Sequence, residues 1–413
     1  MNLTSKLPRV GTTVFTTMSR RAAELGAINL GQGFPDYEID PRLAELIYEG
    51  MRAGHNQYAP MPGLAALREV IATRLQGRYG AAFDAEREIT VTLGATEAIF
   101  SAVQALVGPG DEVIIFDPAY DSYEPAIELA GARCVHVALE PPHFRHDWQR
   151  IAAACNARTR LIILNSPHNP GCSCVAAEDL TALAGLARRF DLAVISDEVY
   201  EYIVFDGLRH HSVLAHPELR ERSVAVYSFG KTLHATGLRV GYAVAPPTLT
   251  AELRKVHQFN TFSIATALQW GIARYLAERP RTGEDLPAFF AARRDRFIAA
   301  MQAGSAAWSL PPSEGSFFQL LDYGRISRAA DVQFADELLT QAGVALIPVS
   351  VFYREPPPRM TLVRACIAKR EATLDAGAAR LAAFAQARTR AGAPGAATTT
   401  PAAGAATHAQ STP

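Results

Sequence analysis

The sequence predicts an α/β protein, with a doubly wound domain around a mainly parallel sheet and a smaller α+β domain after it. Three observations lead to this fold class. From about residue 88 to residue 246, short runs rich in Val and Ile alternate with longer segments of helical spacing. Those short runs are continuously apolar, as burial on both faces of a parallel sheet requires. The chain has 413 residues, 49% of them hydrophobic, so it can bury a large core and form more than one domain.

The apolar runs are the expected strands of the first domain, and they cover residues 89–93, 112–116, 161–165, 193–197, 224–228 and 239–244. Parallel strands bring their carboxyl ends to one edge of the sheet, and ligands of open α/β sheets bind outside that edge. We therefore expect the functional residues directly after these runs.

The second domain is indicated by residues 286–304, which have helical spacing, and by weaker strands near 316–321 and 344–347. We expect a large domain over residues 46–285 and a small domain over 286–388, to which the N-terminal segment 1–45 contributes. The end of the chain is built almost wholly of Ala, Gly, Thr and Pro. Such a composition cannot offset the entropy of ordering, so we expect a disordered tail without a catalytic role over residues 389–413.

The overall charge and composition exclude several classes of protein. The formal net charge is −1, so neither nucleic acid nor a membrane surface is an expected partner, and a small molecule is favoured. No signal peptide or membrane span is recognisable, which predicts a cytoplasmic protein. Five cysteines without a CxxC pair make neither a disulfide framework nor a zinc site. His143 and His146 have a spacing that suits metal ligands on a helix, but their Pro-Pro context favours a solvated loop.

Lys231, in the run SFGKT at residues 228–232, directly follows a predicted strand. A desolvated lysine amine condenses with an aldehyde to a Schiff base, which is how enzymes hold pyridoxal 5′-phosphate (PLP). A solvated surface lysine is the plainer interpretation. A nucleotide-binding P-loop is a third, but Ala225 stands where that motif needs its first glycine, and no clear phosphate-capping helix follows.

Two further strand ends carry groups that PLP requires. Asp197 ends an apolar run, where a carboxylate against the pyridine nitrogen would stabilise a substrate carbanion. Gly94 to Thr96 lie between a strand and a helical segment, where backbone N–H groups bind phosphate. Each signal is weak alone, because an aspartate at a strand end often caps a helix and a glycine often ends a strand.

Several longer segments then resemble one family in the right order. They are NLGQGFPDY (29–37), NQYAPMPG (56–63), LGATEA (93–98), DPAYDSY (117–123), NSPHNPG (165–171), SDEVYE (196–201), SFGKT (228–232) and VRACIAK (363–369). From about residue 29 to 380 the chain resembles the PLP-dependent aminotransferases of fold type I, class I/II, and within them the methionine and kynurenine aminotransferase branch. The resemblance implies an enzyme whose large domain has a mainly parallel seven-stranded sheet.

This resemblance assigns roles around the cofactor ring. Lys231 would hold PLP as a Schiff base and, once displaced by the substrate, move the proton as general base and acid. Asp197 would pair with the pyridinium nitrogen, and Tyr120 would stack on the ring. Asn169 and Tyr200 would hydrogen-bond the phenolic oxygen of the cofactor, and Asn169 would also contact the substrate.

The resemblance also implies how the cofactor phosphate is bound. Backbone groups of Ala95 and Thr96, the hydroxyl of Ser228 and the guanidinium of Arg239 would contact it. Tyr58 would reach the same phosphate from a neighbouring subunit. That role implies a homodimer with shared active sites.

Arg364 stands inside the apolar run 362–367, where a guanidinium must be paired or is costly. A structural ion pair is one interpretation. The resemblance instead makes Arg364 the bidentate clamp for the substrate α-carboxylate, helped by the backbone of Gly33. Gly31 and Gly33 also resemble the start of a dinucleotide fingerprint, but Asp36 occupies the third glycine position.

The predicted reaction is ping-pong transfer of the amino group of an L-amino acid to a 2-oxo acid. The branch favours methionine, with aromatic amino acids and kynurenine as further donors, in a pocket formed by Phe34, Tyr37, Tyr120 and Phe262, which could equally be core residues. His234 departs from the family pattern, where a small residue is usual. Two alternatives are β-elimination from cysteine conjugates and a PLP-fold ligand-sensing regulator.

Overall fold

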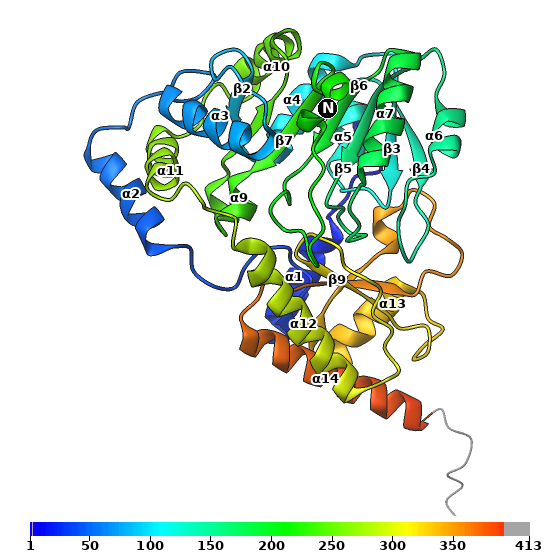
Figure 1. The fold of residues 1–413 in the computed structure, drawn as a ribbon. Helices are drawn as coiled ribbons and strands as arrows, with labels where there is room; N and C mark the ends of the chain where they lie inside the picture. Colours follow the sequence, from blue (N-terminus) through cyan, green and yellow to red (C-terminus); the bar gives the residue numbers. More distant parts are fainter. Residues whose placement is uncertain (2, 392–413) are drawn as a thin grey trace, which may run out of the picture.

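A seven-stranded sheet forms the centre of the larger part of the computed structural model, which describes residues 1 and 3–391 (Figure 1). The strand order is β2-β8-β7-β6-β5-β3-β4. Strand β8 is antiparallel to both of its neighbours, and the other pairs are parallel. The strands are β2 (Ile89–Thr92), β3 (Glu112–Asp117), β4 (Arg133–Ala138), β5 (Thr159–Asn165), β6 (Ala193–Asp197), β7 (Ser223–Ser228) and β8 (Gly241–Val244). The predicted α/β class with a mainly parallel seven-stranded sheet is confirmed.

All six predicted strands of this sheet are present, and two differences have a local cause. The last one begins at Gly241 rather than at residue 239, because Arg239 has a φ of +52° in the left-handed region, which no strand residue adopts. Strand β4 was not predicted. It lies at the edge of the sheet and is only partly buried, so it lacks the continuous apolar run of the central strands.

Alternate residues of the central strands face two separate cores, which explains their continuous hydrophobicity. Ile114 and Ile162 join one core, and Val113 and Leu161 join the other. Helices α4 (Gly94–Leu106), α5 (Tyr123–Leu129) and α10 (Pro247–Asn260) cover the second core, and helices α3 (Ala65–Tyr79), α6 (Trp148–Ala154), α7 (Ala177–Phe190) and α11 (Thr266–Glu278) contribute to the first. Shorter helical turns of this part are α8 (Pro217–Arg220), α9 (Phe229–Thr232), η1 (Val213–Ala215) and η2 (Thr236–Leu238).

Local sequence signals set several helix ends. Helix α2 (Pro41–Arg52) has proline at its first position, and the side chain of Asp40 accepts a hydrogen bond from the Arg42 N–H at 2.8 Å. Helix α3 ends at Gly80, whose φ of +70° favours glycine. These caps satisfy backbone groups that a helix end otherwise leaves unpaired.

The smaller part holds a three-stranded antiparallel sheet in the order β11-β12-β9, beneath the larger part in Figure 1. The strands are β9 (Phe318–Asp322), β11 (Ile347–Pro348) and β12 (Leu362–Cys366), and the N-terminal β1 (Ile28–Asn29) pairs in parallel with β10 (Val344–Ala345). The helices are α1 (Val14–Glu24), α12 (Leu286–Gly304), α13 (Asp331–Glu337), the π-helical segment η3 (Leu338–Ala342), the short 3-10 helix η4 (Ser350–Phe352) and α14 (Glu371–Ala391).

Predictions for this part are met unevenly. Helix α12 has the predicted bounds. Strand β9 begins two residues later than predicted, and the run 344–347 divides between β10 and β11, which belong to different sheets. Strand β12 was not predicted, because buried Arg364 interrupts its apolar pattern. The proposed boundary at residue 46 falls inside α2, and we retain the domain limits as a proposal.

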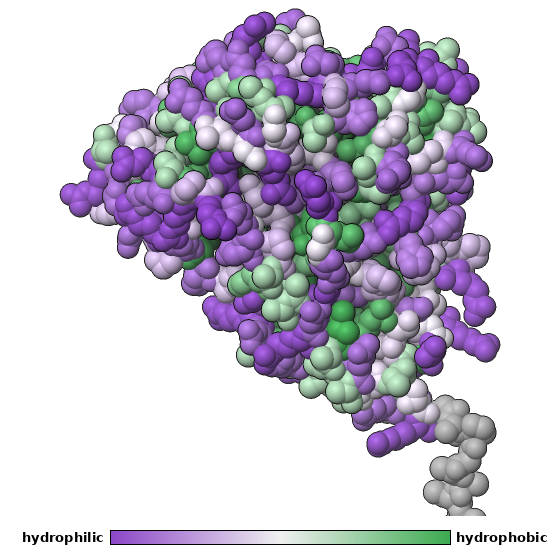
Figure 2. Space-filling model, in the orientation of Figure 1, coloured by the Kyte–Doolittle hydropathy of each residue, from purple (hydrophilic) through white to green (hydrophobic). Residues whose placement is uncertain are grey.

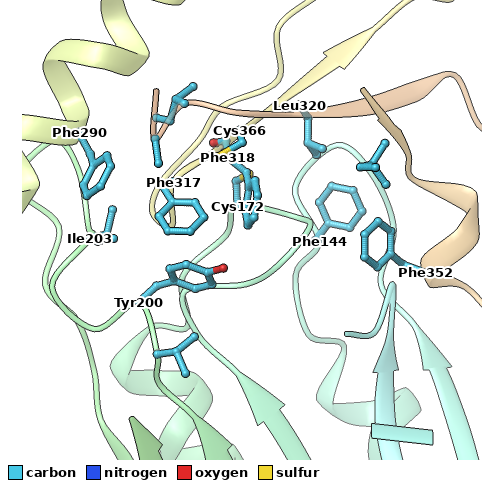
Figure 3. Close-up of a cluster of buried hydrophobic side chains, with 14 of the residues drawn as sticks. Phe144, Cys172, Tyr200, Ile203, Phe290, Phe317, Phe318, Leu320, Phe352 and Cys366 are labelled. Carbon is cyan, nitrogen blue, oxygen red and sulfur yellow. The ribbon is translucent and has the colours of Figure 1, made fainter. Parts of the chain in front are cut away.

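Aromatic side chains fill the boundary between the two parts (Figure 3). Tyr200 of the larger part packs edge-on against Phe317, with ring centroids 5.0 Å apart, and Phe317 packs against Phe290 of α12 at 5.9 Å. All three side chains are buried. The carboxyl edge of the large sheet is therefore closed on one side by the smaller part.

Polar residues cover most of the face seen in Figure 2. No helix between residues 3 and 391 is long and apolar enough to cross a membrane. The predicted tail lies outside the described residues from residue 392 onward, and its first three residues belong to α14. His143 and His146 lie in a loop, as predicted, and His143 is exposed. The His146 ring is not solvated as predicted, since it packs against Phe116 and Trp148.

Candidate active site

A cavity of about 280 Å³ lies at the carboxyl edge of the large sheet, between that sheet and the smaller part. It brings together eleven of the fifteen predicted site residues. They are Gly33, Ala95, Thr96, Tyr120, Asn169, Asp197, Tyr200, Ser228, Lys231, Arg239 and Arg364. These residues come from seven separate stretches of the chain, so the fold assembles the site from the strand ends, as expected for an open α/β sheet.

Lys231 lies in the single turn α9, directly after β7. Its Nζ donates a hydrogen bond to the carbonyl of Gly33 at 3.3 Å and lies 5.0 Å from the ring centre of Phe317. Burial lowers the pKa of Lys231 to about 8. At pH 7 about a tenth of this amine is therefore neutral and nucleophilic, far more than for a lysine of ordinary pKa. The chain after α9 returns to antiparallel β8 without a long helix, which agrees with rejecting a P-loop.

Asp197 is the last residue of β6 and is buried. Its Oδ2 accepts a hydrogen bond from the Tyr123 hydroxyl at 2.6 Å. Burial raises the pKa of Asp197 to about 6, against the opposing effect of the Tyr123 hydrogen bond. A cation placed beside this carboxylate would be strongly stabilised, because little water competes for it.

Asn169 follows the carboxyl end of β5, Tyr200 follows that of β6, and both line the cavity. The backbone N–H of Asn169 donates to Asn165 Oδ1 at 2.8 Å, and its own Oδ1 accepts from Arg364 Nη1. Burial raises the pKa of Tyr200 well above 10, so its hydroxyl stays a hydrogen-bond donor. Tyr120 packs edge-on against Tyr123 at 5.7 Å.

An anion-binding cradle forms where α4 begins. Helix α4 has no side-chain cap at Leu93, so the N–H groups of its first turn carry no capping side chain. Ala95 and Thr96 of this turn line the cavity together with Ser228 and Arg239. Gly241 lets β8 pass close to this helix end, because a Cβ there would lie 2.9 Å from the backbone nitrogen of Ala95. Uncapped helix N–H groups, a hydroxyl and a guanidinium suit a phosphate.

Arg364 is 1% exposed in strand β12. Its Nη2 donates to the carbonyl of Gly31 at 3.2 Å, and its guanidinium lies 3.9 Å from the ring centre of Phe318. Among the described residues Arg364 makes no ion pair, and its Nε has no hydrogen-bond partner. Burial lowers the pKa of Arg364. The structural ion pair is thus not found here, and a buried cation with an unsatisfied N–H suits a carboxylate ligand.

The backbone contacts near Arg364 differ from the expected ones. Gly31, rather than Gly33, accepts the hydrogen bond from the guanidinium, and the carbonyl of Gly33 accepts from Lys231 instead. Both glycines come from the segment after β1. The N-terminal segment therefore contacts both the amine and the guanidinium of the site.

Four predicted site residues lie outside this cavity. Tyr58 is 85% exposed and packs edge-on against Phe262, itself 41% exposed. Tyr37 packs against His234, with Tyr37 Oη 3.4 Å from His234 Nδ1. His234 thus packs in an aromatic group beside the site and does not line the cavity. Phe34, expected in the substrate pocket, is 44% exposed beside the Lys369 amine and is likewise outside it.

Other residues of the site were not predicted. The cavity is also lined by Phe15, Gln32, Ile99, Asp121, Asn165, Val199 and Phe318. Tyr123 does not line it, but its hydroxyl donates the hydrogen bond to Asp197. Asp121, Tyr123 and Asn165 stand inside the motifs DPAYDSY and NSPHNPG, which was the available signal. Phe15 and Phe318 had no such signal, because their position depends on how the smaller part packs. No group of three or more His, Cys, Asp or Glu side chains that could hold a metal occurs between residues 3 and 391.

Comparison with known proteins agrees with this geometry. Residues 26–381 match the family model described as aminotransferase class I and II. The chain is 50% identical over 377 residues to the methionine aminotransferase of Escherichia coli, covering 91% of this chain and 97% of that protein. It is 36% identical to the probable N-succinyldiaminopimelate aminotransferase DapC of Mycobacterium tuberculosis, covering 92% and 98%. It is 33% identical to mouse kynurenine–oxoglutarate transaminase 1, covering 89% and 93%.

A solved structure from Escherichia coli, described as having a methionine aminotransferase function, superposes with a TM-score of 0.90. Its sequence is 49% identical, and the superposition covers 93% of this chain and all of that one. The likeness therefore extends over both parts of the fold.

Proposed function

Because this chain belongs to the class I and II aminotransferases, enzymes that move an amino group from an amino acid to a 2-oxo acid, we propose that L-methionine is its amino donor and that PLP on Lys231 is its cofactor. The observation that carries the proposal is the meeting of Lys231 and Arg364, a nucleophilic amine and a carboxylate-binding fork, in one cavity. The 50% identity to a methionine aminotransferase favours methionine as the donor.

The residues of the cavity fit PLP. The uncapped start of α4, with Ser228 and Arg239, suits the phosphate. The carboxylate of Asp197, buried and held by Tyr123, suits a protonated ring nitrogen. When bound, PLP supplies an electron sink for the electron pair that is left when a proton leaves the substrate Cα. No cation other than Lys231, Arg239 and Arg364 lines the cavity within residues 3–391.

Lys231 acts as the base that takes the proton from the substrate Cα. A lysine with an ordinary pKa near 10.5 is almost wholly protonated at neutral pH, whereas burial brings the pKa of this one to about 8. The contact with the Gly33 carbonyl at 3.3 Å orients the amine. Asn169 and Tyr200, which line the same cavity, supply further hydrogen-bond donors for the cofactor ring.

Arg364 binds the substrate α-carboxylate. Asn169 and the Gly31 carbonyl fix the guanidinium plane, so two parallel N–H groups are presented to a carboxylate. The substrate is thereby oriented with its Cα beside Lys231. The same contact serves the amino acid and the 2-oxo acid, so both half-reactions use one site.

The remaining wall of the cavity suits an apolar side chain. Phe15, Ile99 and Phe318 line it, and a thioether packs well beside aromatic rings. Aromatic amino acids and kynurenine are secondary donors in this proposal, in line with the similarity to a kynurenine–oxoglutarate transaminase. Exposed Tyr58 and Phe262 support a homodimer in which Tyr58 reaches the phosphate of the partner subunit's site.

The test is the visible spectrum of the purified, PLP-loaded protein before and after L-methionine is added without an acceptor. Loss of the yellow band supports methionine as the donor. A yellow band that methionine leaves unchanged rejects methionine and directs the search to aromatic amino acids, kynurenine and cysteine conjugates. In Lys231→Ala the yellow band should be absent and turnover abolished, and unchanged turnover would refute the role of Lys231.

A further inference from the structure

A buried pair of a carboxyl group and an imidazole adjoins the anion-binding cradle. Glu97 belongs to the first turn of α4, directly after Thr96, and its side chain is 7% exposed. His257, in the last turn of α10, is fully buried, and its Nδ1 lies 3.0 Å from Glu97 Oε1. The two helices pack against each other over the second core. Because burial of ionisable groups is costly, the pair needs a physical reason.

Glu97 holds the turn that leads into the cradle. Its Oε2 accepts a hydrogen bond at 3.1 Å from the backbone N–H of Leu93, the residue before α4. Gly94, within this turn, has a φ of +73°, and a Cβ there would lie 2.9 Å from Arg239 Nη2. The shape of the turn therefore determines how closely the Arg239 guanidinium approaches the start of α4.

The hydrogen bonds of His257 fix a proton between the two side chains. Its Nε2 lies 3.2 Å from the carbonyl oxygen of Met61, which can only accept, so this nitrogen carries a proton. Its Nδ1 faces the Glu97 carboxyl group, which also accepts from the Ser101 hydroxyl at 2.6 Å. A hydrogen bond between Nδ1 and Glu97 requires one further proton, on the ring or on the carboxyl group. The pair is electrically neutral in either case.

This neutrality matters because the adjoining cradle suits an anion. A phosphate monoester carries a charge of about −1.5 to −2 at pH 7. The uncapped N–H groups of α4 and the Arg239 guanidinium attract it, whereas an unpaired carboxylate in the same helical turn would repel it in surroundings with little water. The proton that His257 shares removes this repulsion and leaves the bond between Glu97 and Leu93 in place.

Building on the proposed function, we propose that His257 is a positioning residue for the cofactor phosphate and that it acts through Glu97. It neutralises the carboxyl group in the first turn of α4, and its bonds to Glu97 and Met61 join α10 to the start of α4 and to the segment before α3. His257 does not line the cavity itself. Its replacement should therefore weaken binding of the phosphate and leave binding of the cofactor ring unchanged.

PLP and pyridoxal test this role, because pyridoxal has the same ring and aldehyde but lacks the phosphate. The dissociation constants of both compounds are measured from the yellow band with the full-length protein after removal of its cofactor, and the pyridoxal value is divided by the PLP value. In His257→Gln the amide can replace Nε2 at Met61 but offers no donor to Glu97. This ratio should then fall by about tenfold or more.

His257→Asn is the second variant, in case His257→Gln folds poorly. Its amide can donate to Glu97 but has no proton to share, so it should lower the ratio as well. Glu97→Gln in the His257→Gln background is the rescue. It removes the charge of the carboxylate, and the ratio should return to within about threefold of the wild type.

His210→Gln is the matched control. His210 also bonds a buried carboxyl group, with its Nε2 2.9 Å from Glu198 Oε2 and both side chains 1% exposed. Neither residue lines the catalytic cavity or belongs to α4. This variant removes a comparable buried pair and should keep the wild-type ratio.

The outcomes separate this role from the proposed function. A ratio that both His257 variants leave unchanged overturns the role of His257, and so does an equal fall in His210→Gln, because the effect would then be a general loosening. A double variant whose ratio stays as low as that of His257→Gln also overturns it, since the carboxylate charge would not be the cause. Absence of a yellow band when PLP is added to the wild type instead rejects the proposed function and the inference that rests on it.

Discussion

Replacing Arg364 by methionine separates a substrate clamp from a structural arginine. Arg364 is 1% exposed, and the hydrogen-bond partners of its guanidinium in the described chain are the Asn169 side chain and the Gly31 carbonyl. Burying a guanidinium without a counter-ion costs several kcal/mol. Losing two hydrogen bonds and leaving their acceptors unpaired costs about 1–3 kcal/mol each. These terms nearly cancel, so Arg364→Met should change the free energy of unfolding by no more than about 2 kcal/mol.

The effect on activity should be far larger. A bidentate contact to a carboxylate consists of two charge-assisted hydrogen bonds of about 1.5–3 kcal/mol each. Their loss lowers kcat/KM for the methionine half-reaction by about 10²–10⁴-fold. Rapid-mixing spectroscopy measures this rate, and thermal unfolding of the same sample measures stability.

Arg294→Met is the comparison, because Arg294 is also buried but forms a bidentate ion pair with Asp206 at 2.6 and 2.7 Å. It should lower the unfolding temperature and retain the half-reaction. If Arg364→Met instead loses less than about tenfold in rate, or unfolds at a lower temperature than Arg294→Met, the clamp argument fails.

Two predictions concern titration in the cofactor-free protein. Because burial lowers the pKa of Lys231 to about 8, its acetylation rate, followed by peptide mass spectrometry, should rise with a midpoint near pH 8, and a midpoint near the ordinary 10.5 would contradict the burial argument. Because burial raises the pKa of Asp197 from 3.8 to about 6, ionisation of Asp197 lowers the stability of the fold as the pH rises from 3.8 to about 6, and the loss persists above that pH. Asp197→Asn should therefore gain about 1–2 kcal/mol of stability relative to wild type between pH 5 and pH 8 in urea titrations, and a gain that shrinks with pH would refute this sign.

Much of the site could be predicted because its chemistry follows local rules. Lys231 and Asp197 are polar residues directly after continuous apolar strands, and parallel strands bring such positions to one edge. The start of α4 likewise follows from a glycine between a strand and a helix. Each of these features is determined by residues that lie close together in the sequence, so a single sequence reveals them.

The unpredicted features depend on contacts between distant segments. The sequence could not say that Gly31 rather than Gly33 would bond Arg364, because the N-terminal segment and β12 are more than three hundred residues apart. Asp121 and Tyr123 stand two positions apart in one motif, yet Asp121 lines the cavity, whereas the Tyr123 hydroxyl bonds to Asp197. Their roles depend on the turn before α5, which propensity does not fix.

The parallel pairing of β1 with β10 affects how the protein is made. Ile28 pairs with Val344, so a nascent chain exposes its N-terminal segment until more than three hundred further residues have left the ribosome. At about 5–20 residues per second that interval is roughly 15–60 s. During translation the segment with Gly31 and Gly33 remains unpaired while the large sheet can already form, and the site closes only after β10 has been synthesised.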